Sequence, residues 1–91
     1  MKIHELLSGP EKWTRQAMGR NEKGGVCASN SPSAVKWCLK GAAEVCYGFD
    51  GGRYMSVVNR LGQEVGSVEA YNDRPSRTFE EVHALVKRLD V

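Results

Sequence analysis

The run from Ala34 to Ala43 constrains the fold of this chain more than any other segment. Its apolar residues and those that follow repeat at helical spacing and form two neighbouring stripes, one of Val35, Cys38, Leu39, Ala42 and Cys46 and one of Ala34, Trp37, Gly41 and Val45. A helix that is apolar over most of its circumference belongs in the middle of a domain. We predict that this helix begins near Ser31 and Pro32, because a serine N-cap followed by proline is typical of a helix start.

Gly41 lies inside this predicted helix, where glycine costs about 1 kcal/mol relative to alanine. Such a cost is understandable where another backbone or a tryptophan ring packs closely against the helix. Trp13 is a candidate for that contact.

Three further segments have the apolar spacing of helices. Residues 2–7 form a short one that stops at Ser8-Gly9-Pro10. Residues 54–65 form a longer one, with apolar side chains at Tyr54, Val57, Val58, Leu61 and Val65. The last helix begins at a capping box, in which Thr78 and Glu81 each satisfy a free amide, and buries Phe79, Val82, Val86 and Leu89.

Extended structure is predicted in two places. Residues 11–29 suit a hairpin that turns near residues 21–24, although Pro10 alternatively opens a helical turn through Met18. Residues 67–71 alternate in polarity and predict a short strand beside the segment around Trp13. We therefore expect a single α+β domain over residues 1–91, mainly helical, with three to four helices and a short two- or three-stranded β element.

Composition excludes some classes of function. No apolar run approaches the roughly 20 residues of a membrane helix, and no signal peptide is apparent, so we expect a cytoplasmic protein with no membrane partner. The net charge of +2 is too small to argue for nucleic acid. Cys38 and Cys46, two turns apart on one helix, would lie about 12 Å apart, which is too far for a disulfide. With Cys27 they are expected to be free thiols.

Several of these residues together resemble a known family. The matching points are Trp13-Thr14, Gln16-Ala17, Gly24, Ala34-Val35, Trp37-Cys38-Leu39, Gly41-Ala42, Asn72-Asp73, Arg77-Thr78 and Val82. The pattern resembles DUF6197, a domain of unknown function found in small bacterial and phage-encoded proteins. This chain departs from it in Tyr71, where tryptophan is usual, and in a shorter middle helix. The resemblance implies a small accessory protein and brings no activity, cofactor or catalytic residue.

The sequence favours a non-enzymatic protein. A cysteine nucleophile with its base is conceivable from Cys38, His83 and either Asn72 or Asp73. However, Cys38 is expected on a buried apolar face, where the pKa of a thiol rises and the thiol becomes inert. The histidines and cysteines lack the paired spacing of zinc ligands, and no phosphate-binding loop is present. We therefore expect no catalytic residue, no metal and no cofactor.

The best candidate for a binding site is the loop of residues 72–78. Arg74 and Arg77 precede a helix N-terminus and could hold an anion, although Thr78 and Glu81 are expected to occupy its amides and Asp73 can pair with Arg77. An exposed tryptophan or tyrosine beside an arginine would instead form a hot spot for a partner, unless it completes the core. The candidate binding residues are Trp13, Arg15, Tyr71, Asn72, Asp73, Arg74 and Arg77.

The leading functional hypothesis is an interaction module that binds a protein partner. Such a module would suit a phage or prophage accessory protein that binds a host macromolecule. One alternative is a nucleic-acid-binding protein that uses the basic segment 12–23, with Lys12, Arg15, Arg20 and Lys23. The other is a small-ligand-binding protein or cysteine-dependent enzyme at Cys38 and His83.

Overall fold

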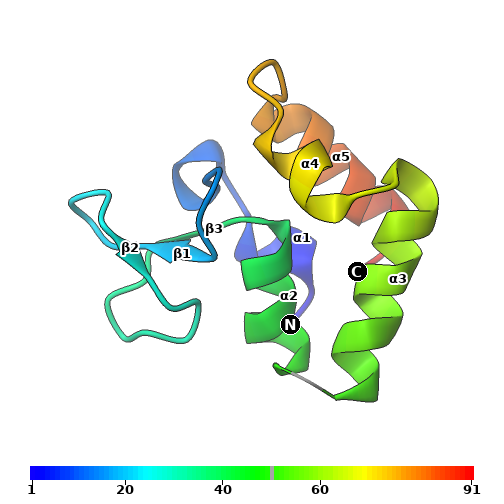
Figure 1. Cartoon of the computed structure of the whole chain (residues 1–91), viewed down its shortest axis with the longest axis horizontal. Helices are drawn as coiled ribbons and strands as arrows, with labels where there is room; N and C mark the ends of the chain where they lie inside the picture. The colour runs from blue at the N-terminus through cyan, green and yellow to red at the C-terminus, as the bar shows by residue number, and fades with distance from the viewer. Residues whose placement is uncertain (50) are drawn as a thin grey trace.

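The computed structural model describes residues 1–49 and 51–91. Along these residues the elements are α1 (Ile3–Leu6), the 3₁₀-helix η1 (Pro10–Lys12), β1 (Gly19–Arg20), β2 (Val26–Cys27), β3 (Lys36–Trp37), α2 (Leu39–Tyr47), α3 (Gly52–Val65), α4 (Val68–Asp73) and α5 (Phe79–Leu89). In Figure 1, α2 lies in the centre, with the small sheet on one side and α3 on the other, and α4 and α5 lie toward the end where α2 begins. The predicted class, a mainly helical α+β domain with a small β element, is confirmed.

The three short strands form an antiparallel sheet with β1 in the middle. Gly19 of β1 lies opposite Cys27 of β2 on one side and opposite Trp37 of β3 on the other. Asn21 closes the turn between β1 and β2, because its Oδ1 accepts hydrogen bonds from the backbone N–H groups of Lys23 and Gly25 at 3.0 and 2.9 Å. The predicted hairpin is confirmed, and the alternative helical turn from Pro10 extends only to Lys12.

The segment before α2 is a strand, so the predicted helix start at Ser31 and Pro32 is wrong. The Val35 N–H donates to the Arg20 carbonyl at 2.8 Å, which holds this segment to the sheet. The helix begins at Leu39, and its N-cap is Cys38, whose Sγ accepts from the Gly41 N–H. A strand of two residues is too short to show an alternating pattern, so the helical spacing of α2 also covers the residues of the strand before it.

The segment after α3 is a helix and not the predicted strand. The Ser67 hydroxyl caps α4 by accepting from the Ala70 N–H at 3.1 Å. Val68 and Asn72, one turn apart, are the buried residues of this helix. Five residues of alternating polarity are too few to distinguish a strand from a short amphipathic helix. With α4, the described residues contain five α-helices.

The core surrounds α2, the predicted central element. It consists of Ile3, Leu7, Trp13, Leu39, Ala42, Ala43, Leu61, Val68, Val82, Leu85, Val86, Leu89 and Val91. A side chain at Gly41 would overlap the carbonyl oxygen of Met18. The close contact predicted at Gly41 is therefore made by the backbone of Met18 and not by the ring of Trp13.

The start of α5 confirms the predicted capping box. The Thr78 N–H donates to Glu81 Oε1 at 2.9 Å, and the Glu81 N–H donates to Thr78 Oγ1 at 3.2 Å. Beyond α5, the carbonyl of Val91 accepts hydrogen bonds from the Ile3 N–H and the Tyr47 hydroxyl, so the end of the chain packs against α1 and α2. Within residues 1–49 and 51–91, none of the helices has the length and apolar character needed to span a membrane.

Candidate functional site

Asn72 is the centre of the candidate site, and its side chain is 1% exposed. Its Oδ1 accepts hydrogen bonds from Trp13 Nε1 at 2.8 Å and from the Leu39 N–H at 3.1 Å. Its Nδ2 donates to the Thr14 carbonyl at 3.1 Å and to Asp73 Oδ1 at 2.9 Å. A carboxamide has two acceptor and two donor positions, so all four are used inside the protein. We call these five residues the Asn72 network; it ties η1, α2 and α4 together.

Arg15 and Arg20 use their guanidinium groups within the protein. Arg15 donates to the carbonyls of Arg74 and Arg77 in the loop before α5. Arg20 donates to Thr14 Oγ1 at 2.8 Å and to the Arg15 carbonyl at 3.1 Å. Both arginines therefore brace the backbone around the Asn72 network.

Arg77 closes the loop between α4 and α5. Its guanidinium carbon lies 3.6 Å from the centroid of the Tyr71 ring, its Nε donates to the Tyr71 carbonyl at 3.0 Å, and it forms an ion pair with Glu81 at 3.3 Å. The predicted pairing of Asp73 with Arg77 is wrong, because Asp73 Oδ1 accepts instead from the Gln16 N–H at 2.8 Å. With the capping box occupying amides at the start of α5, the geometry favours a structural role for this loop over an anion site.

The structure brings the predicted binding residues together on one side of the molecule, but their aromatic groups are not free surface. Trp13 is only 8% exposed, and Arg15 lies 4.5 Å from its ring centroid. Tyr71 is half-buried and faces Arg77 rather than Arg74. Arg74 is exposed and contributes its carbonyl to the bracing.

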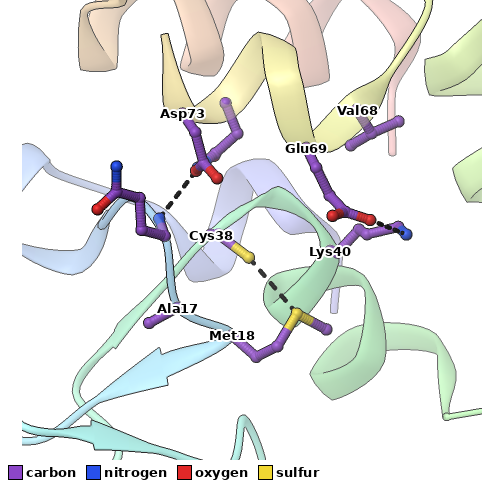
Figure 2. A pocket seen from close by; sticks show the side chains of 9 residues that line it. Ala17, Met18, Cys38, Lys40, Val68, Glu69 and Asp73 are labelled. Carbon is purple, nitrogen blue, oxygen red and sulfur yellow. Dashed lines mark hydrogen bonds and ion pairs between the residues drawn. The ribbon is translucent and has the colours of Figure 1, made fainter. Parts of the chain in front are cut away.

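A hollow of about 240 Å³ lies beside the Asn72 network, between the segment before β1, the start of α2, and α4. Two pairs of side chains that line this hollow contact each other in Figure 2. The Lys40 ammonium and the Glu69 carboxylate form an ion pair at 2.6 Å. The Cys38 thiol faces the Met18 thioether, with Sγ and Sδ 3.8 Å apart.

Cys38 does not meet the base that the sequence suggested for it. Burial raises the pKa of its thiol, and the hydrogen bond from the Gly41 N–H opposes that rise only in part. His83 stacks against the Phe79 ring on α5, with centroids 5.3 Å apart, and does not line the hollow. His83 is therefore not placed as a base for Cys38 in this hollow.

A second region, which the sequence pattern does not reveal, lies where α2 ends and α3 begins, at the lower end of both helices in Figure 1. We call this end of the two helices the α2–α3 corner; it includes Val45 and Tyr47 near the end of α2, Phe49 just after it, and Arg53 and Met55 in the first turn of α3. Phe49 and Met55 are 46% and 48% exposed. Arg53 lies 5.6 Å from the ring centroid of Tyr47. The available signal was the pair of large apolar residues Phe49 and Met55, which flank Gly51 and Gly52 in the sequence.

The fold and these sites define a small, mainly helical α+β domain with a buried structural polar network and an exposed apolar corner. The chain belongs to DUF6197, a family of unknown function, which it matches over residues 1–89. This confirms the resemblance found in the sequence. No curated protein and no solved structure matches the chain.

Proposed function

We propose that this protein is a non-enzymatic interaction module that binds a protein partner through the α2–α3 corner. The observation that carries the proposal is the exposure of large apolar side chains there: Val45, Phe49 and Met55 are three of the five exposed large hydrophobics of the described residues, which also include Met1 and Val26. Aromatic residues, methionine and arginine are enriched in protein interfaces. Tyr47 with Arg53 supplies the aromatic and arginine pairing typical of hot spots.

The chemistry of the corner suggests the chemistry of the partner. Arg53 and Arg60 are exposed cations on α3, within two turns of each other. An apolar segment with acidic residues beside it would complement both features. We further infer that this partner is a host macromolecule and the protein a phage or prophage accessory factor, a role with which the small size of the domain agrees.

The nucleic-acid alternative receives less support from the basic segment. Arg15 and Arg20 donate to carbonyl and hydroxyl groups of the protein itself. Lys12 and Lys23 are then the cations of that segment that are left to contact phosphate groups. Two lysines neutralise few phosphates, so their contribution to binding would be weak and strongly salt-dependent.

The test compares two variants of the tagged protein in affinity capture from native host lysate. The double substitution Phe49→Ser with Met55→Ser removes the apolar groups of the corner, and Val26→Ser is the matched control, because Val26 is 70% exposed on β2. We expect a protein that is retained by the parent and by Val26→Ser and lost by the double variant. With the purified partner, calorimetry should show binding weakened by about tenfold or more.

Other outcomes contradict the proposal. Equal retention by all three proteins would place the interface elsewhere. Retained nucleic acid that is released as salt rises would support the basic segment instead. An empty eluate from every lysate tested would leave the corner without a partner and would count against an interaction module.

A further inference from the structure

We propose that Arg15 and Arg20 bind the carboxylate of a small organic acid in a groove that both arginines line. The groove has a volume of about 520 Å³, and Gln16, Asp73 and Pro75 are among its walls. It adjoins the hollow beside the Asn72 network, because Gln16 and Asp73 line both. The site does not use the amides at the start of α5, which the capping box occupies, and it is independent of the proposed partner surface.

Both arginines keep free N–H groups after they brace the backbone. A guanidinium group has five N–H donors. Arg15 uses two of them on the carbonyls of Arg74 and Arg77, which leaves three. Arg20 uses three of them, all on neutral oxygen atoms of the protein, which leaves two. The remaining donors are sufficient to hold a carboxylate in the groove.

Neither arginine has a counter-charge. Both residues are half-buried, and among residues 1–49 and 51–91 neither forms an ion pair with a carboxylate. Their oxygen partners are neutral, so both positive charges remain uncompensated. Charges that are partly withdrawn from water interact more strongly with an opposite charge than fully solvated ones do. An anion in the groove would therefore be stabilised by both guanidinium groups.

The fold holds the two guanidinium groups in place before a ligand binds. The guanidinium carbon of Arg15 lies 4.5 Å from the ring centroid of Trp13. Arg20 is fixed by hydrogen bonds to Thr14 Oγ1 at 2.8 Å and to the Gly24 carbonyl at 2.9 Å. A planar guanidinium matches the geometry of a carboxylate, and groups positioned in advance lose less entropy on binding.

The charge of the groove favours a monoanion. Arg15 and Arg20 contribute two positive charges and Asp73 one negative charge, so the net charge of these three residues is +1. A carboxylate carries one negative charge, whereas a phosphate monoester carries about −1.5 to −2 at pH 7. Asp73 is held in place because its Oδ1 accepts from the Gln16 N–H at 2.8 Å. A phosphate would therefore leave excess negative charge beside Asp73, and a carboxylate would not.

NMR titration of the ¹⁵N-labelled parent protein with benzoate, at constant ionic strength, tests the proposal. Benzoate is the probe because Pro75 gives the groove an apolar wall. We expect saturable shifts of the Nε–H signals of Arg15 and Arg20, with much smaller shifts for Arg60, an exposed arginine of α3. Inorganic phosphate should bind more weakly than benzoate. Shifts that rise linearly without saturation, or equally at all three arginines, would overturn the site.

Three variants sharpen the test. Arg20→Gln should weaken benzoate binding by about tenfold, since a hydrogen bond to a charged group is lost. Arg60→Gln removes the same charge from the exposed face of α3 and should leave binding unchanged. Asp73→Asn keeps an acceptor oxygen for the Gln16 N–H and removes the negative charge, so benzoate should bind severalfold more tightly.

Circular dichroism checks that each variant is folded, and the titration of the parent together with Asp73→Asn decides the question if Arg20→Gln does not fold. Equal affinity of folded Arg20→Gln and Arg60→Gln would refute the site, as would weaker binding in folded Asp73→Asn. Tighter binding of phosphate than of benzoate by the parent would refute the assignment of a carboxylate ligand.

Discussion

The Asn72 network and the α2–α3 corner differ in how their side chains meet solvent. In the network, every donor and acceptor of a buried carboxamide has a partner within the protein. At the corner, Phe49 and Met55 leave nearly half of their surface in solvent. The buried polar group stabilises one arrangement of η1, α2 and α4, because each unmade hydrogen bond there is costly. The exposed apolar groups add little to the fold and remain available for a partner.

The largest effect on stability is expected from Asn72→Ala. The substitution leaves Trp13 Nε1 and the Leu39 N–H without a partner, and each buried unsatisfied group costs about 1–3 kcal/mol. We expect the free energy of unfolding in urea to fall by about 3 kcal/mol. Asn59→Ala, on the exposed face of α3, is the matched control and should change it by less than about 0.5 kcal/mol.

Trp13→Phe provides a milder form of the same test if Asn72→Ala does not fold. It removes one donor and leaves Asn72 Oδ1 with the Leu39 N–H, so a loss of about 1 kcal/mol is expected. Equal stability of parent and Asn72→Ala would show that the network does not hold the elements together.

Gly41→Ala should produce the next largest loss. Alanine favours a helix by about 1 kcal/mol over glycine, but here its methyl group would overlap the Met18 carbonyl, and overpacking costs about 1–3 kcal/mol. Gly62→Ala in α3 is the matched control, because a methyl group there would meet no atom within 4 Å beyond its chain neighbours and the backbone of its own helix. We expect opposite signs by urea denaturation: Gly41→Ala destabilises the protein, and Gly62→Ala stabilises it by about 0.5–1 kcal/mol. Stabilisation by both would disprove the close contact.

Thr78→Ala should cost about 1 kcal/mol, the usual value of a lost N-cap. The Thr78 hydroxyl accepts from the Glu81 N–H, and no other side chain of the capping box can replace it. Ser76→Ala, in the exposed loop just before the cap, is the control and should be neutral in thermal unfolding. A similar loss in both variants would mean that the loop, and not the cap, determines the stability of α5.

The same capping box predicts a pH dependence. The hydrogen bond from the Thr78 N–H, aided by Arg77, lowers the pKa of Glu81. A lowered carboxyl pKa stabilises the fold at pH values above the unfolded pKa, and this stability is lost as pH falls through the folded pKa. The difference in stability between the parent and Glu81→Gln should therefore shrink on acidification below about pH 5. A difference that stays constant down to pH 3 would contradict this assignment.

Local patterns predicted the parts of the fold that depend on local interactions. The amphipathic spacing of residues 54–65 and the Thr78–Glu81 capping box gave α3 and α5, and Asn21 marked the hairpin turn. By contrast, β3 exists because Arg20 supplies a pairing partner from a distant segment. The local spacing of residues 34–37 therefore predicts a helix where the structure has β3, and the alternation of residues 67–71 is too short to distinguish the helix α4 from a strand.

The candidate sites show the same division. The sequence points to Asn72, Asp73 and Arg77 as candidates, yet the roles of Asn72 and Asp73 depend on Trp13 and Gln16, more than fifty positions away. The hydrogen bond from the Cys38 thiol to the Met18 thioether could not be found from spacing either, because it joins two segments twenty residues apart. Exposure of Phe49 likewise depends on how α2 and α3 pack.

The smallest effect on stability is expected at the corner. Surface substitutions away from buried groups usually change stability by less than about 0.5 kcal/mol each, so Phe49→Ser with Met55→Ser should unfold in urea at nearly the parent midpoint. A loss above about 2 kcal/mol would mean that the corner supports the fold as the Asn72 network does, and any loss of partner binding in that variant would then be indirect. Unchanged stability together with lost binding would separate the two regions, because the Asn72 network would then hold the fold while the corner recognises the partner.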